Sequence, residues 1–209
     1  MIDYKKEIAK KLLQINAINL NYEQSFTWAS GIKSPIYCDN RKSLSDIGAR
    51  NLICDGFVSK SNSFPDYDII AGVATGGIAH GMLVADRLGL PFIYVRTSAK
   101  GHGMKNAVEG KMEPGQRVLV IEDLISTGGS SYQAIQSIGE AGGKIAGMMA
   151  IFTYGFDESK KLFEDHQVKV EVLTDYDTLI TCAMELDIIK QDQIAELMEW
   201  KKDPKSWRQ

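Results

Sequence analysis

Two adjacent carboxylates, Glu122 and Asp123, directly follow the apolar run 117–121 (RVLVI), and hydroxyl residues and glycines fill 126–131 (STGGSS). The apolar run predicts a buried strand, and a helix is expected after the turn. Glycines let several backbone N–H groups point inward, and a helix N-terminus adds a positive dipole end, so that the turn can cradle a phosphate. Because two anions would repel a bare phosphate, the pair indicates a ligand with vicinal hydroxyls or a bound divalent cation. The string therefore predicts a phosphorylated sugar whose ribose hydroxyls lie on the two carboxylates, whereas a lone TGGS is more typical of a surface turn with capping residues.

Two further segments carry chemistry that fits the same ligand. Residues 71–77 (AGVATGG) form a second glycine-rich turn after a strand-like run, where the backbone can approach a ligand closely. Residues 96–110 include Arg96, Lys100 and His102 among several glycines. Loops of this length without secondary structure are usually functional or disordered, and a cationic loop beside a phosphate site is typical of a lid that closes on a polyphosphate. A solvated charged loop is the alternative interpretation of the loop alone.

Hydrophobic periodicity predicts the elements that must position these residues. Strands are expected at 68–73, 91–95, 117–121, 144–154 and 168–173. Helices are expected at 3–16, from Ser45 and Asp46 to about 60, from the first glycine turn to 88, from the second to 141, and at 176–184 and 191–200. A hairpin is expected within 25–41, and 96–113 shows no clear period. Continuous apolar strands alternating with helices indicate an α/β fold, an open and mostly parallel sheet with helices on both faces.

Composition narrows the function classes. The 209 residues carry a net charge of −3, which is a poor match to nucleic acid, and no apolar run approaches the length of a membrane span. The three cysteines are widely spaced, which indicates reduced thiols rather than a disulfide framework or a zinc site. With no signal-peptide pattern at the N-terminus, we expect a cytoplasmic protein that binds small molecules and contacts neither nucleic acid nor membrane.

The string VLVIEDLISTGGSS (118–131) closely resembles the signature of the type I phosphoribosyltransferases. That resemblance implies the fold of this family, a phosphoribosyl pyrophosphate substrate that arrives as its Mg²⁺ complex, and transfer of ribose phosphate onto a nitrogenous base. The loop pattern R-x-x-x-K-x-H-G from Arg96 and the pattern S-G-x-x-S-P-x-Y at 30–37 resemble the branch of the family that acts on orotate. The expected products are orotidine monophosphate and pyrophosphate, in pyrimidine biosynthesis.

The resemblance also implies roles for particular residues. Lys100, His102 and Asp123 are the expected catalytic residues, with His102 as a general acid. Phosphoribosyl pyrophosphate is expected on Arg96, Lys100, His102, Glu122, Asp123, Leu124, Ile125, Ser126, Thr127, Gly128, Gly129 and Ser130, its pyrophosphate on Ala74, Thr75 and Gly76, and orotate on Ser126 and Tyr37. No direct metal ligand from the protein is expected, since Mg²⁺ comes with the substrate.

The resemblance implies an organisation as well. Residues 1–45 are expected to form an N-terminal helix and a small hood over the base, and 46–209 the phosphoribosyltransferase core with C-terminal helices. A homodimer is expected, in which the lid loop 96–110 of one chain reaches the site of the other. Many relatives have a lysine where this chain has Ala29, and some have an arginine where it has Tyr154, so the partner of the orotate carboxylate stays open.

Two other functions compete with this prediction. A purine phosphoribosyltransferase would share the glycine turns and differ in the base. A regulator that keeps the fold to sense phosphoribosyl pyrophosphate and bind RNA or DNA would show a basic excess, which this chain lacks.

Overall fold

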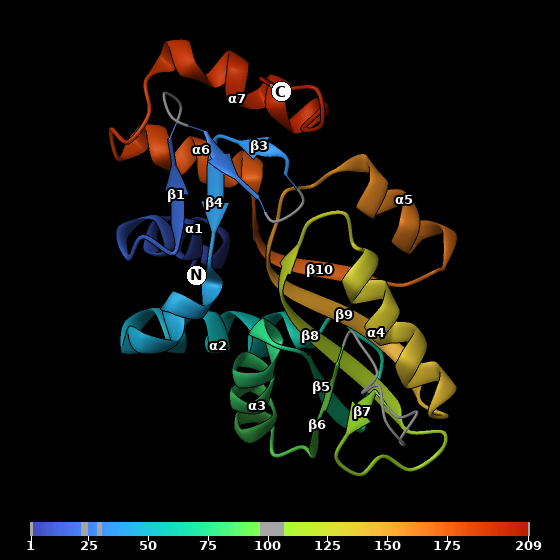
Figure 1. The fold of residues 1–209 in the computed structure, drawn as a ribbon. Coiled ribbons are helices and arrows are strands. Elements are labelled where there is room, and N and C mark those ends of the chain that lie inside the picture. The colour runs from blue at the N-terminus through green and yellow to red at the C-terminus, as the bar shows by residue number, and fades with distance from the viewer. Residues whose placement is uncertain (1, 22–24, 29–30, 97–106, 209) are drawn as a thin grey trace.

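A six-stranded sheet organises the computed structural model, which describes residues 2–21, 25–28, 31–96 and 107–208 (Figure 1). The strand order is β10-β9-β8-β5-β6-β7. Five strands run parallel: β5 (Ile69–Val73), β6 (Phe92–Val95), β8 (Arg117–Ile125), β9 (Lys144–Thr153) and β10 (Val170–Asp175). The short edge strand β7 (Val108–Glu109) pairs antiparallel with β6. The predicted α/β class with a mostly parallel sheet is confirmed.

Helices cover both faces of this sheet, which explains the apolar runs in its central strands. One core joins the sheet to α1 (Tyr4–Gln14), α2 (Ile47–Ser61), α3 (Gly76–Leu88) and α6 (Tyr176–Glu185), and the other joins it to α4 (Gly129–Glu140) and α5 (Asp157–Asp165). Leu119 and Ile121 of β8 lie in the first core, and Val118 and Val120 lie in the second. Successive residues of a strand face opposite sides, so both sets must be apolar.

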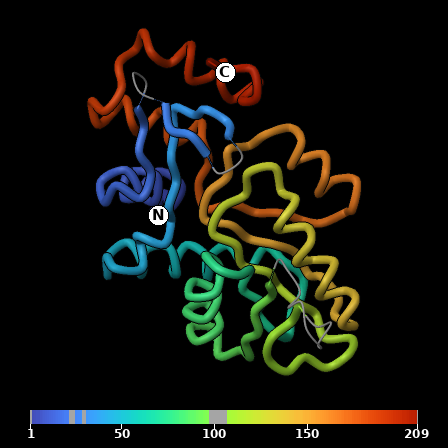
Figure 2. The backbone as a smooth tube through the Cα atoms, viewed as in Figure 1, coloured from blue at the N-terminus to red at the C-terminus, as the bar shows by residue number. Residues whose placement is uncertain are grey.

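The N-terminal segment adds two small antiparallel sheets. Strand β1 (Ile18–Leu20) pairs with β4 (Ile36–Cys38), and β2 (Phe26–Thr27) pairs with β3 (Lys33–Ser34), which confirms the predicted hairpin. The C-terminal helix α7 (Ile194–Lys202) lies at the same end of the molecule as this hairpin (Figures 1 and 2). The ring centroids of Trp28 beside β2 and Trp200 of α7 are 5.8 Å apart, so the two segments are in contact.

Strand β8 is longer than the sequence predicts. It continues past 121 to Ile125, because Glu122, Leu124 and Ile125 still pair with β9. The prediction that the strand ends before the acidic pair is therefore wrong. Glu122 and Asp123 belong to the strand itself, so alternation along the strand governs where their side chains point.

Other boundaries and elements also differ from the prediction. Helix α2 is capped by Asp46, whose Oδ1 accepts a hydrogen bond from the Ala49 N–H at 2.7 Å, and Ser45 instead ends a 3₁₀ helix over Asn40–Ser45. The period-less stretch 96–113 contains β7, and the polar sequence DESKKLFED forms α5, an element the sequence does not predict. Strand β10 lies at 170–175 rather than 168–173, and a 3₁₀ turn (Gln191–Gln193) precedes α7. Within the described ranges, every helix is too short or too polar to cross a membrane.

Candidate active site

The carboxyl ends of β5 and β8 meet at one edge of the sheet, because these strands are parallel neighbours. The turn after β5 holds Ala74, Thr75 and Gly76, with a cis peptide bond between the first two. A Cβ placed on Gly76 would overlap the carboxylate of Asp123, so the first glycine turn lies directly against this side chain. The structure thus brings together the predicted pyrophosphate turn and the predicted catalytic carboxylate. Edges of this kind are where ligands bind in open α/β sheets.

Two helix N-termini face this edge without a side-chain cap. Helix α3 begins after Thr75 and α4 after Gly128, and neither receives a capping bond from a side chain in the described part of the chain. Helices α1, α2 and α6, by contrast, are capped by aspartates. The first N–H groups of a helix have no intrahelical partner, so an anion at α3 or α4 can accept their hydrogen bonds. This arrangement suits a ligand with phosphate at two places.

The second glycine turn has a backbone that requires glycine at one position. Gly128 has φ +85°, in the left-handed region, and a Cβ there would stand 3.1 Å from the Phe163 ring. Thr127, Gly129 and Ser130 are exposed, whereas Ser126 is half-buried. Their N–H and hydroxyl groups can therefore reach a phosphate from solvent.

The two residues before this turn are less accessible. Ile125 is 2% exposed within the core, and Leu124 is half-buried. A contact from Ile125 to a ligand is thus limited to its main chain. The assignment of the whole set 122–130 to phosphoribosyl pyrophosphate stays a prediction.

The two adjacent carboxylates have different surroundings. Glu122 is buried: its Oε1 accepts a hydrogen bond from the Asp123 N–H at 2.9 Å, and its Oε2 accepts one from Ser131 Oγ at 2.9 Å. Burial, with the nearby charge of Asp123, raises the pKa of Glu122 well above its ordinary value. Asp123 is half-buried and lies on the side of Gly76. The pair therefore offers one carboxylate to the open edge, and the other ties β8 to the first turn of α4.

The sequence does not predict the hydrogen bonds that the side chains of Ser131 and Asn40 make within the site. Ser131 is expected from the sequence to donate to phosphate, but its hydroxyl donates to Glu122 instead. Asn40 is 1% exposed, and its Nδ2 donates to the Asp123 carbonyl at 2.6 Å. This contact fixes the hood against β8. The signal for it in the sequence is weak, since Asn40 lies just after the pattern at 30–37 and 83 residues before its partner.

The hood itself lies over the end of β9. The Trp28 ring centroid lies 5.1 Å from that of Tyr154, with the two planes tilted by 35°, and Tyr154 is 2% exposed. Tyr37 is 40% exposed and its ring lies 5.7 Å from Phe26. The predicted contacts of Tyr37 and Ser126 with orotate stay predictions.

Of the predicted lid residues, the structure describes Arg96. Its Nη2 lies 3.0 Å from Glu109 Oε1, and its N–H donates to the Ala107 carbonyl at 2.9 Å. This places the guanidinium at the foot of the loop, beside β7. Lys100 and His102 lie outside the described residues, so their predicted roles stay predictions.

A cavity of about 410 Å³ opens between the hood, the second glycine turn and the C-terminal segment. Its walls include Trp28, Ile32, Thr127, Gly155 and Lys201. Among the described residues, no group of three or more His, Cys, Asp or Glu side chains is arranged to hold a metal ion.

Comparison with known proteins identifies the family. Residues 40–181 match the phosphoribosyl transferase domain. The chain is 48% identical over 208 residues to an orotate phosphoribosyltransferase of Cytophaga hutchinsonii, covering 99% of this chain and 100% of the relative, and 50% identical over 203 residues to that of Porphyromonas gingivalis, covering 97% of each. The structure is similar to an orotate phosphoribosyltransferase of Aeropyrum pernix, with a TM-score of 0.76 at 27% identity over 88% of this chain and 99% of that one.

The matched domain contains both glycine turns and the acidic strand end, and the full-length relatives extend the match through the hood and the C-terminal helix. The sequence-based prediction of the family is confirmed, and the chain belongs to the phosphoribosyl transferases and, within them, to the orotate phosphoribosyltransferases.

Proposed function

We propose that this chain transfers ribose 5-phosphate from phosphoribosyl pyrophosphate to orotate at the edge formed by β5 and β8, with Asp123 as the carboxylate that acts on the ribose. The observation that carries this assignment is the contact of the Asp123 carboxylate with Gly76 at the uncapped start of α3. The sugar is held there between two anion sites, with its pyrophosphate at α3 and its 5-phosphate at α4. The products are orotidine monophosphate and pyrophosphate, as in pyrimidine nucleotide biosynthesis.

The chemistry requires charge to be stabilised at two points. The bond from C1 of the ribose to pyrophosphate oxygen breaks as the bond to the orotate nitrogen forms, and C1 becomes cationic in between. An anion beside the ribose lowers the energy of that state, and N–H groups at α3 stabilise the growing charge on the leaving group. Asp123 is the half-buried carboxylate at this position, and Gly76 lets it approach the α3 amides.

Arg96, Lys100 and His102 are proposed to close on the pyrophosphate. Arg96 is placed for this by β6, which ends one residue before it and neighbours β5 in the sheet. A histidine of ordinary pKa near ~6.5 can carry a proton to the leaving group, which is the role proposed for His102. Because β6 and β5 are adjacent, a loop that starts at Arg96 begins next to the α3 turn.

Magnesium is proposed to enter as part of the substrate. The donor set at the site fits this, since Glu122 has both oxygens bonded within the chain and Asp123 alone presents a carboxylate to the edge. Mg²⁺ keeps several waters and binds readily to substrate phosphates with one or two carboxylates. When bound, it neutralises pyrophosphate charge.

We also propose a homodimer in which loop 96–110 acts on the partner's site, and a location in the cytoplasm. Two-fold dimers are the commonest assemblies of soluble proteins. At about 3.3 Å per residue, a loop of this length can cross a subunit interface. Cys38, Cys54 and Cys182 are all free thiols, which suits a reducing compartment.

Substrate choice tests the proposed function. With phosphoribosyl pyrophosphate and Mg²⁺ present, orotate should be consumed, followed by the loss of its ultraviolet absorbance, while adenine, guanine and uracil should not react. Release of pyrophosphate measured by a coupled assay serves as an independent readout. Turnover of a purine with orotate inert would contradict the assignment.

A further inference from the structure

Orotate carries a carboxylate next to the nitrogen that receives the ribose, and this group needs a partner within the site. A carboxylate that leaves water is costly to bury unless a cation or several donors meet it. The inference that follows rests on orotate being the base. It concerns the cation on this chain that recognises the carboxylate.

The cavity between hood and C-terminal segment has the walls that such a base needs. Trp28 supplies an aromatic face, and Ile32 from the same hairpin adds an apolar one. Thr127 belongs to the turn that we assign to the 5-phosphate, so the cavity begins at the proposed sugar site. A flat ring attached to C1 can therefore enter it.

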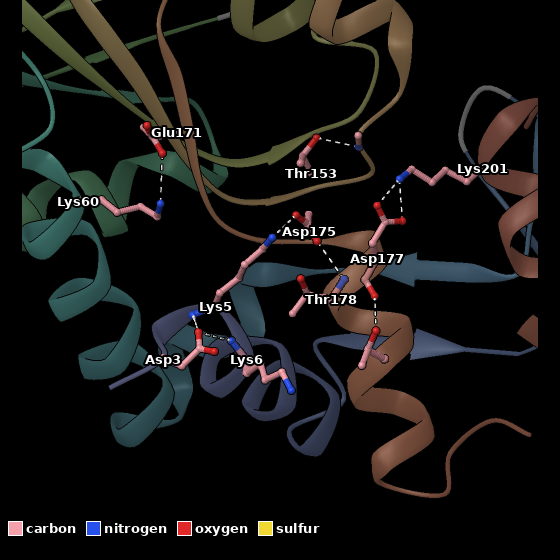
Figure 3. Close-up of polar contacts among 12 residues, drawn as sticks. Asp3, Lys5, Lys6, Lys60, Thr153, Glu171, Asp175, Asp177, Thr178 and Lys201 are labelled. Atoms are coloured by element: carbon pink, nitrogen blue, oxygen red, sulfur yellow. Dashed lines mark hydrogen bonds and ion pairs between the residues drawn. The ribbon is translucent and has the colours of Figure 1, made fainter. Parts of the chain in front are cut away.

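Lys201 brings a positive charge to the wall opposite the hood. Its Nζ lies 3.6 Å from the point where a Cβ on Gly155 would stand, so the ammonium lies directly beside the backbone of Gly155. Helix α7 supplies Lys201, and Gly155 follows β9, at the end where Trp28 covers Tyr154. The Lys201 side chain is only 18% exposed. Figure 3 shows it reaching from α7 toward the segment that contains Thr153.

The other lysines around the cavity are poorer candidates. Lys160 pairs with Asp157 at 3.0 Å and its side chain is 57% exposed, and Lys205 approaches Glu158 at 3.9 Å and is 71% exposed. Lys202, which also lines the cavity, is exposed as well. Charges this exposed are screened by water, so their electrostatic interactions with a partner are weak. Lys201 is the most buried of these four lysines, so its charge acts through less solvent.

We propose that Lys201 is a specificity-determining residue that recognises the carboxylate of orotate and of the orotidine monophosphate product. Its present partner is Asp177 at the start of α6, with Nζ at 2.7 Å from Oδ1 and 2.8 Å from Oδ2 (Figure 3). An ammonium has three donors, so one remains for a ligand. The Asp177 side chain is more than half exposed, so water screens its charge, and the third donor of the ammonium is left for a carboxylate in the cavity.

Two nucleotides that differ only in this carboxylate test the proposal. We expect the wild type to bind orotidine monophosphate more tightly than uridine monophosphate in calorimetric titrations. In Lys201→Met, which keeps the apolar stem, affinity for orotidine monophosphate should fall at least ~10-fold, as for a hydrogen bond to a charged group. Affinity for uridine monophosphate should change by less than about 3-fold, and the KM for orotate should rise while the KM for phosphoribosyl pyrophosphate holds.

Two control variants separate recognition from a structural role. Asp177→Asn breaks the same ion pair from the other side, and it should keep or increase the preference for orotidine monophosphate. Lys10→Met removes another lysine that pairs with α6, through Glu185 at 2.8 Å, and should leave the preference unchanged. An unchanged preference in Lys201→Met, or an equal loss in Asp177→Asn, would overturn the proposal. If the wild type itself failed to use orotate, the proposed function rather than the role of Lys201 would have failed.

Discussion

Removing the charge of Asp123 should abolish most activity without weakening the fold. Asp123→Asn keeps the shape that fits against Gly76 and deletes the anion beside the ribose. Loss of one electrostatic group of this kind typically costs at least ~100-fold in kcat, about 2.7 kcal/mol. The charge of Asp123 also raises the pKa of Glu122, so its removal relieves repulsion at a buried carboxyl group. Thermal stability at neutral pH should therefore stay equal or rise slightly.

The neighbouring carboxylate provides the matched contrast. Glu122→Ala would leave the Asp123 N–H and the Ser131 hydroxyl without their acceptors in a buried place. An unsatisfied buried donor costs about 1–3 kcal/mol, and 1 kcal/mol shifts Tm by roughly 2–4 °C in a chain of this size. Glu122→Ala should thus lower Tm by at least ~3 °C.

Steady-state turnover of orotate and differential scanning calorimetry measure both variants. Asp123→Asn should lose activity with an unchanged or slightly higher Tm, whereas Glu122→Ala should have a lower Tm. Turnover of Asp123→Asn within about 3-fold of wild type would refute the role given to Asp123. A Tm loss in Asp123→Asn as large as in Glu122→Ala would show that both carboxylates serve the fold.

Two further predictions follow from the assembly and from a buried histidine. A Lys100→Ala chain and an Asp123→Asn chain, each nearly inactive alone, should together recover about a quarter of wild-type activity after subunit exchange. Half of the random dimers are mixed, and each mixed dimer has one intact site out of two. No recovery after demonstrated exchange would mean that the loop acts on its own chain. Burial lowers the pKa of His80 to about 4 from 6.5, so between these pH values protons bind preferentially to the unfolded chain. The contribution of His80 to the free energy of unfolding should therefore be full above pH 6.5 and decline as the pH falls toward 4. Urea unfolding at pH 7 and pH 5 should show a loss about 2 kcal/mol larger in wild type than in His80→Gln, and equal losses would exclude His80 as the cause.

The parts of the fold predicted from the sequence are those where one physical signal dominates. Strands β5, β6 and β9 are continuous apolar runs, because both faces of the sheet are covered. The signal fails at the end of β8, where Glu122 and Asp123 interrupt the apolar run. Backbone pairing with β9 continues there regardless of side-chain polarity. Helix α5 was missed for a related reason, since few apolar residues mark its buried face.

The sequence predicts the motifs of the site but not the contacts between distant segments that complete it. Both glycine turns can be recognised in the sequence because glycine is favoured where the local backbone conformation requires it, as at Gly128 with its φ of +85°. The bond from Asn40 to the Asp123 carbonyl and the approach of Lys201 to Gly155 join segments far apart in the chain. No spacing rule gives such pairs, because they depend on how the hood and α7 pack onto the finished sheet.

The acidic pair illustrates how the fold places two neighbouring carboxylates in different surroundings. Glu122 is buried with both oxygens bonded within the chain, whereas Asp123 is half-buried against Gly76, so the two side chains are unequally placed to meet a ribose. Asp123 faces the start of α3, and Glu122 binds Ser131 in the first turn of α4. Glu122 therefore ties the second glycine turn to the strand that carries Asp123. Because a displacement of about 1 Å can cost 100-fold in rate, we expect the hydrogen bond from Ser131 to Glu122 to be required for the distance between the two turns.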